Sequence, residues 1–169
     1  MKKPAPGEFD LIQRIRRRQD RNNFPPFIKE GMGDDCAILD TTGTSRLVVS
    51  TDLLLEGIHF PPGLLNPAAI GRKAFLVNLS DIAAMGARPR ACLLGLALPP
   101  QVAADILDPL IDGFLDEAVR HGTPLVGGDL SASDRILLAV TIFGEVSHGE
   151  PLTRAGARPG DCLLYTSPS

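Results

Sequence analysis

The segment from residue 66 to residue 87, NPAAIGRKAFLVNLSDIAAMGA, constrains the fold more than any other part of this sequence. Pro67 near its beginning and Gly86 near its end are typical helix boundaries, and its apolar residues recur at helical spacing. Asn78 and Asp81 are one turn apart, so they share a face of a helix that is otherwise too apolar to lie mostly in solvent. Because burying a carboxylate without a partner is costly, we expect a cation close to Asp81.

Short apolar segments on both sides of this helix predict strands and one further helix. The predicted elements are a hairpin of 36–40 and 46–52 around the turn TTGTS, a strand at 90–100, an amphipathic helix at 102–122, a short strand at 123–131 and a long strand at 135–146. Long apolar strands need to be covered, since exposed strands pair with other chains.

Composition limits the classes of protein to which the chain can belong. Its 169 residues, with a net charge of −3, correspond to about one domain, and no stripe of Lys and Arg indicates nucleic-acid binding. The one basic run, RIRRRQDR at 14–21, predicts the solvated face of a first helix whose other face carries Leu11, Ile12 and Ile15. No apolar run approaches the roughly 20 residues that span a bilayer. We therefore expect a cytoplasmic protein that binds neither membranes nor nucleic acid.

Five aspartates follow a pattern that indicates a shared site. They are Asp34 and Asp35 directly before a strand, Asp52 directly after another strand, Asp81 within the helix, and Asp129 directly after Gly127 and Gly128. Each one alone is most simply a turn residue or a helix cap. Together with the hydroxyl groups of Ser50, Thr51 and Ser80, they form a set of hard oxygen donors suited to Mg²⁺ or Mn²⁺.

Several carboxylates around more than one Mg²⁺ are a common way to hold a polyphosphate. The sequence contains no G-x-x-x-x-G-K-[ST] loop and no G-x-G-x-x-G after a strand, which argues against a P-loop or dinucleotide-binding protein. The pair Gly127-Gly128 suits either a close approach of the backbone to phosphate or a plain turn, and the residues alone leave both readings open.

Six motifs resemble, in order and spacing, the N-terminal part of the thiamine-monophosphate kinase family. They are GEFDLI, GMGDDCAIL, VVSTDLLLEGIHF, IGRKAFLVNLSDIAAMGARP, LVGGDL and LTRAGARPGD, and they cover roughly residues 7–164. This family is similar in its ATP-binding domain to aminoimidazole ribonucleotide synthetase, selenophosphate synthetase and a hydrogenase-maturation factor. The resemblance implies that ATP phosphorylates thiamine monophosphate to thiamine diphosphate with the help of several Mg²⁺ ions.

The resemblance also implies roles for individual residues. The implied metal ligands are Asp35, Ser50, Thr51, Asp52, Asp81 and Asp129, with Asp34 beside them in the same loop. The implied nucleotide contacts are Gly128 and Arg154, and His59 is the implied contact with the thiamine substrate. No residue is assigned a catalytic role.

By the same resemblance we expect an α+β fold, in which a mixed, mostly antiparallel sheet carries its helices on one face, as in the N-terminal domain of aminoimidazole ribonucleotide synthetase. We expect residues 1–164 to form an ATP- and Mg²⁺-binding domain that dimerises, residues 165–169 to be a non-native tail, and the family's C-terminal domain to be absent. Two alternatives stay open. One is an isolated nucleotide-binding or dimerisation module, and the other is a different ATP-using enzyme of the superfamily or an unrelated Mg²⁺-dependent phosphohydrolase.

Overall fold

A computed structural model of the chain describes residues 25–162, with gaps at 32–33, 42, 44, 64–65, 102 and 147–148, and also residues 12, 13, 15 and 17. Most of the predicted basic helix face and the whole predicted tail, 165–169, lie outside the described residues. No helix in the described part is both long enough and apolar enough to cross a membrane.

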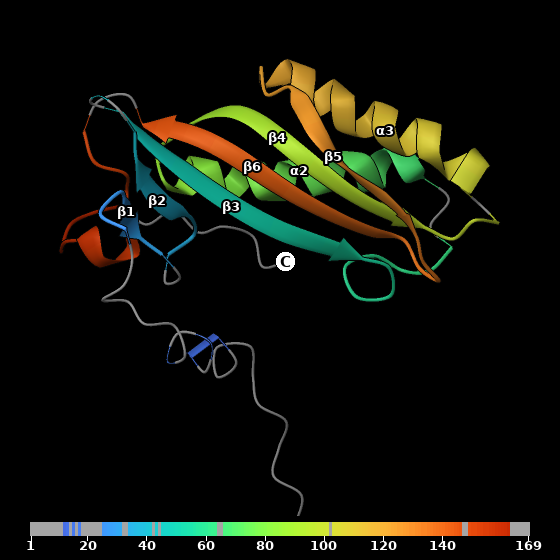
Figure 1. Cartoon of the computed structure of the whole chain (residues 1–169), viewed down its shortest axis with the longest axis horizontal. Helices are drawn as coiled ribbons and strands as arrows, with labels where there is room; N and C mark the ends of the chain where they lie inside the picture. Colours follow the sequence, from blue (N-terminus) through green and yellow to red (C-terminus); the bar gives the residue numbers. More distant parts are fainter. Residues whose placement is uncertain are drawn as a thin grey trace, which may run out of the picture.

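Six strands form one sheet, and two long helices cover one of its faces (Figure 1). The elements are β1 (Ile28–Glu30), β2 (Ala37–Asp40), β3 (Arg46–Leu55), α2 (Pro67–Ala84), β4 (Arg88–Leu98), α3 (Ala103–Arg120), β5 (Leu125–Ala132), β6 (Leu137–Val146) and the short 3₁₀ helix η2 (Arg154–Gly156). The strand order is β1-β2-β3-β6-β4-β5, and every neighbouring pair is antiparallel except β4 and β5, which α3 connects in parallel. The expected α+β fold with a mixed, mostly antiparallel sheet is confirmed.

One strand extends well beyond its predicted end, and the predicted strand 123–131 ends within one residue of its prediction. β3 pairs with β6 over ten successive residues, so the ladder continues past Asp52 to Leu55. β5 pairs with β4 beyond the glycine pair as far as Ala132. The prediction that Asp52 directly follows a strand is therefore wrong: it lies within β3, because the pairing partner determines how far the strand runs.

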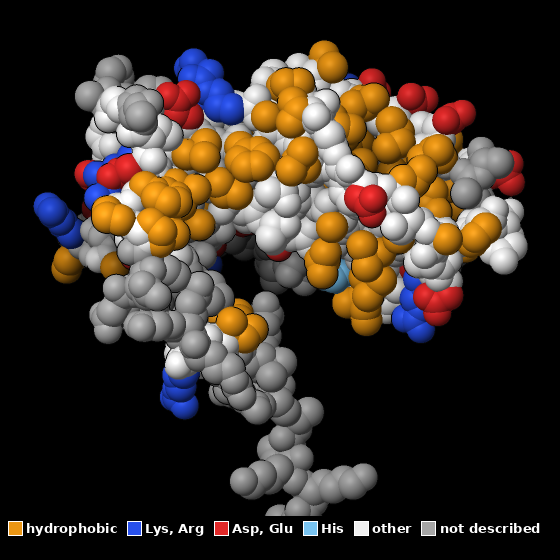
Figure 2. All heavy atoms as spheres, in the orientation of Figure 1, with side chains coloured by type: hydrophobic (Ala, Val, Ile, Leu, Met, Phe, Trp, Pro, Cys, Tyr) orange, Lys and Arg blue, Asp and Glu red, His pale blue; other side chains and the backbone are white. Residues whose placement is uncertain are grey.

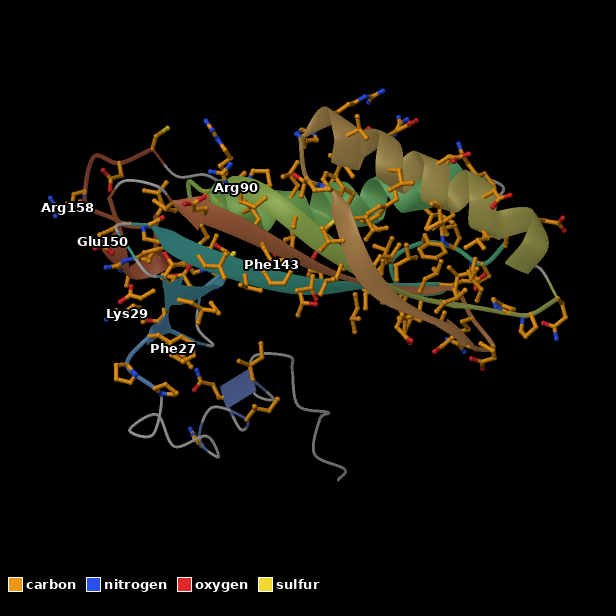
Figure 3. The ribbon with its side chains drawn as sticks, turned by 45° about the horizontal axis from the view of Figure 1, so that its top comes forward. Phe27, Lys29, Arg90, Phe143, Glu150 and Arg158 are labelled. Atoms are coloured by element: carbon orange, nitrogen blue, oxygen red, sulfur yellow. The ribbon has the colours of Figure 1, made fainter. Side chains whose placement is uncertain are left out.

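The two faces of the sheet differ in burial. Alternate residues of β3 and β6, such as Val48 and Ile142, are fully buried beneath the helices. There the ring of Phe75 on α2 packs edge to face against that of Phe114 on α3, with 5.4 Å between the ring centroids. The residues between them point to the other face, which no described helix covers. Figure 2 shows apolar side chains spread over this open face, and Phe143 lies over its middle (Figure 3).

Helices α2 and α3 approach each other so closely that only glycine fits at their contact. A Cβ atom on Gly71 would lie 1.9 Å from the main-chain oxygen of Leu110, and one on Gly113 would lie 2.1 Å from that of Ala68. Neither oxygen can move away without displacing a helix, because both belong to backbone. The distance between the helices is therefore determined by backbone contact.

We expect Gly71→Ala to lower the free energy of unfolding by about 3 kcal/mol, because the added methyl group forces α2 away from α3. Urea unfolding followed by circular dichroism measures this loss. Gly127→Ala is the matched control, since its methyl group would meet only the flexible side chain of Leu93 at 3.4 Å. Equal stability of the two variants would contradict the backbone contact.

Candidate functional site

Both ends of α2 are determined by local sequence, and this positions the polar residues along it. The side chain of Asn66 accepts a hydrogen bond from the main-chain nitrogen of Ala69 at 3.0 Å, and Pro67 is the first helical residue. At the other end Gly86 has a φ of 65°, and the chain turns away from the helix. The predicted helix boundaries are confirmed.

Asn78 joins α2 to β3 from within the core. Its side chain is 2% exposed. Its Oδ1 accepts a hydrogen bond from the main-chain nitrogen of Asp52 at 3.1 Å, and its Nδ2 donates to the main-chain oxygen of Ala74 at 2.9 Å. Both ends of the amide are thus engaged within the fold, so Asn78 positions α2 against β3.

Asp81 lies one turn further along α2 and meets the next inward-facing position of β3. The hydroxyl of Ser50 donates a hydrogen bond to its Oδ2 at 2.5 Å. The pKa of the Asp81 carboxyl is raised to about 6, first by burial and also by the nearby carboxylates of Asp52 and Asp35, whereas the Ser50 hydrogen bond and Arg154 act in the opposite direction. The partly buried carboxyl therefore lies in a surplus of negative charge.

The loop before β2 brings two more carboxylates to this place. Asp34 accepts a hydrogen bond from the main-chain nitrogen of Asp35 at 2.9 Å. Arg154, at the start of η2, donates its own main-chain nitrogen to Asp34 at 2.9 Å and contacts Asp35 through its guanidinium group. We call Asp34, Asp35, Asp52 and Asp81 the acidic cluster. It joins a loop, a strand and a helix that are far apart in sequence.

Three of the residues predicted to bind metal or nucleotide do not lie at the acidic cluster. The side chain of Thr51 lies on the open face of the sheet, where it donates to the main-chain oxygen of Val140 at 3.0 Å. Gly128 and Asp129 lie on β5, which two strands separate from β3, or about 14 Å at usual strand spacing. Asp129 pairs with Gly95 and shares the open face, and its Oδ2 accepts a hydrogen bond from Ser131 at 3.0 Å.

Gly128 is required by packing, whatever else it contacts. A Cβ atom there would lie 1.9 Å from the main-chain oxygen of Leu94 on β4. Of the two readings that the sequence left open, the plain turn is wrong, because the glycine pair lies inside a strand. Its close backbone approach is to a neighbouring strand, and a contact with phosphate stays a prediction.

His59 lies in the loop between β3 and α2. Its Nδ1 accepts a hydrogen bond from the main-chain nitrogen of Leu55 at 3.0 Å, so the proton of the neutral ring is on Nε2. Lys73 of α2 donates to the main-chain oxygen of His59 at 2.8 Å. Lys73 is not among the residues predicted from sequence, although its position eight residues before Asp81 places it on broadly the same side of the helix.

The donor atoms of the acidic cluster fit a magnesium ion in chemistry, since all are carboxylate or hydroxyl oxygens. In the described part of the chain, however, no three His, Cys, Asp or Glu side chains converge closely enough to enclose a metal ion on their own. Few protein ligands around each ion are typical of Mg²⁺ that takes one or two carboxylates from the protein and its other ligands from phosphate and water. The arrangement therefore suits ions that arrive with a phosphorylated ligand.

Comparison with known proteins identifies the family. Residues 33–146 match the model of the AIR synthase related protein, N-terminal domain. The chain belongs to this family. It is homologous to thiamine-monophosphate kinases, being 38% identical to the one from Mycobacterium tuberculosis H37Rv over 157 residues, which are 93% of this chain and 46% of that protein. It is 40% identical to the one from Escherichia coli K12 over 162 residues, which are 96% of this chain and 48% of that protein.

Solved structures agree with this assignment. The structure described as AaThiL complexed with AMPPCP and TMP superposes with a TM-score of 0.77 at 32% identity, covering 90% of this chain and 45% of that one. The thiamine monophosphate kinase of Aquifex aeolicus superposes with a TM-score of 0.73 at 28% identity, covering 95% of this chain and 48% of that one. The chain spans about half the length of the relatives it matches.

The raised pKa of Asp81 makes stability depend on pH. Because folding raises this pKa from 3.8 to about 6, its stabilising contribution is complete below about pH 4 and is lost as pH rises through 6. Asp81→Asn keeps the uncharged form at all pH values. In the presence of EDTA we therefore expect the variant to be more stable than the wild type at pH 7, with the difference vanishing towards pH 4.

Urea unfolding between pH 4 and pH 7.5 measures this difference. Asp112→Asn, which removes an exposed carboxylate of α3, is the matched control and should show no such pH-dependent gain. A gain for Asp81→Asn that is the same at every pH would contradict the assigned protonation.

Proposed function

We propose that this chain forms the ATP- and Mg²⁺-binding part of a cytoplasmic kinase that converts thiamine monophosphate to thiamine diphosphate. The observation that carries the proposal is the acidic cluster, which Asn78 and Ser50 hold at the junction of α2 and β3. The homology to thiamine-monophosphate kinases over more than nine-tenths of the chain supports the choice of substrate.

Several Mg²⁺ ions would be held by Asp35, Ser50, Asp52 and Asp81. Thr51 and Asp129, whose side chains lie on the open face and away from the acidic cluster, stay proposed as ligands of further ions. When bound, the ions would neutralise phosphate oxygens that this acidic surface otherwise repels. Ser50 orients the Asp81 carboxylate by donating to its Oδ2, which leaves Oδ1 for another partner. Asn78 holds the main chain of Asp52, so the two carboxylates keep a constant separation.

Two further contacts complete the proposed site. Arg154 presents a guanidinium group that is 60% exposed and suits the phosphates of ATP, and Gly128 is the other proposed nucleotide contact. His59 is the proposed contact with thiamine monophosphate. Its Nε2 bears the proton of the neutral ring and is free to donate to an acceptor, because Nδ1 already accepts from Leu55.

A transplant into a complete kinase tests the substrate. We would replace the aligned 48% of the E. coli enzyme by this chain and measure formation of thiamine diphosphate from ATP and thiamine monophosphate. We expect turnover that Asp81→Asn reduces at least 100-fold, while His59→Ala raises the KM for thiamine monophosphate and leaves the KM for ATP nearly unchanged.

The alternatives predict other results for a folded chimera. A different ATP-using enzyme would hydrolyse or transfer phosphate without dependence on thiamine monophosphate. A binding module alone would bind ATP and show no turnover. Equal changes in both KM values for His59→Ala would contradict its assignment to one substrate.

We also propose that the chain forms a homodimer through the open face of the sheet. Leu53 is 58% exposed there, and the face continues through Val49, Phe143 and Leu93 on three adjacent strands. A second copy is the occupant that offers the same apolar surface in return. Because Asp129 shares this face, it would lie at the interface of the dimer.

We expect Leu53→Glu to raise the dimer dissociation constant at least tenfold, because it places a charge in an apolar interface. Sedimentation equilibrium over a range of concentrations measures the change. Val119→Glu makes the same substitution at a residue of α3 that is 79% exposed and should leave the constant unchanged. A wild-type chain that stays monomeric at every concentration would contradict the dimer.

A further inference from the structure

Arg154 contacts the acidic cluster in two separable ways. Its main-chain nitrogen donates to Oδ2 of Asp34 at 2.9 Å, which fixes the position of the residue. Its guanidinium group contacts Oδ1 of Asp35 and lies 4.0 Å from Oδ1 of Asp34. The first contact persists if the side chain rotates, so the guanidinium group can leave the carboxylates while η2 stays attached to the loop.

Exposure shows which side of the carboxylates the guanidinium group occupies. The side chains of Asp34 and Asp35 are 7% and 17% exposed, whereas that of Arg154 is 60% exposed. The guanidinium group therefore covers the carboxylates on their solvent side, along the path by which a cation would approach. It also occupies Oδ1 of Asp35, an oxygen that a metal ligand at this position would offer.

Two positive groups compete for this place. A divalent cation prefers charged oxygen ligands, and it repels a guanidinium group that shares them. Asp34 and Asp35 together carry two negative charges, of which Arg154 neutralises one. A divalent cation neutralises both and makes the ion pair with Arg154 unnecessary.

Building on the proposed function, we infer that Arg154 and a divalent cation are alternative partners of Asp34 and Asp35, so that cation binding releases the guanidinium group to the phosphates of the nucleotide. Arg154 then acts as a positioning residue with two opposite effects. It weakens the binding of the cation alone, and it strengthens the binding of the nucleotide together with the cation. Metal and nucleotide consequently bind with positive cooperativity.

Binding of Mn²⁺ to this chain, measured by electron paramagnetic resonance without nucleotide, tests the first effect. We expect Arg154→Gln to bind Mn²⁺ about tenfold more tightly than the wild type, the size of one charge-assisted hydrogen bond that no longer competes. Arg158→Gln is the matched control. Arg158 lies four residues after Arg154, at the edge of the molecule (Figure 3), and its main-chain nitrogen donates a hydrogen bond to Asp161 at 2.7 Å. It should change Mn²⁺ affinity less than twofold.

Calorimetric titration with a non-hydrolysable ATP analogue and Mn²⁺ tests the second effect. Here we expect Arg154→Gln to bind about tenfold more weakly, so the two affinities change in opposite directions. A residue that merely stabilises the loop would weaken both. Arg154→Lys keeps the charge but not the planar group and should give intermediate values, and it serves as the test variant if Arg154→Gln unfolds.

The outcomes separate the inference from the function on which it rests. Unchanged or weaker Mn²⁺ binding by the Arg154 variants would overturn the inference. Failure of the wild type to bind Mn²⁺ even with the nucleotide analogue would instead overturn the proposed function. Tighter binding for both Arg154→Gln and Arg158→Gln would show general charge attraction and would also overturn the inference.

Discussion

The amide of Asn78 is the contact on which the arrangement of the site depends. Helix α2 is apolar on most of its surface, and the backbone contact at Gly71 orients it against α3 without positioning any polar group. Asn78 ties this orientation to β3, because its Oδ1 has to meet the main-chain nitrogen of Asp52 and an unpaired buried amide is costly. Once this pair is formed, Asp81 is directed to Ser50. A hydrogen bond inside the core thus orients a carboxylate at its edge.

The acidic cluster lowers the stability of the protein without a ligand and favours the binding of a cation. Burial raises the pKa of Asp81, and the carboxylates of Asp52 and Asp35 add to the effect. A fold selected for stability alone would separate these charges. Here the surrounding hydrogen bonds hold them in place, so the electrostatic strain is available to be relieved by a positively charged ligand. Repulsion between the carboxylates therefore destabilises the protein without a ligand, and the bound cation removes this repulsion in the complex.

Features with local signals were predicted well from sequence. The hairpin of β2 and β3, the ends of α2 and the long strand β6 each depend on neighbouring residues, and the helical spacing of Asn78 and Asp81 was sufficient to select them. The extent of β3 beyond Asp52 was missed, because it depends on pairing with β6, which is remote in sequence. The contact of Arg154 with Asp34 joins residues 120 positions apart and has no local signal. The face on which Thr51 lies follows from strand register, which the motif alone does not specify.

The close approach of α2 and α3 at Gly71 and Gly113 has a consequence for how this domain can change over evolutionary time. Where two helices are separated by side chains, each core substitution alters their spacing and shifts whatever they carry. Here main-chain atoms act as a fixed stop, so the spacing does not depend on the volumes of the surrounding side chains. Relatives can therefore diverge widely in the residues of the core while the carboxylate on α2 keeps its place. The two glycines thus allow other residues of the core to be substituted without a change in the spacing of the helices.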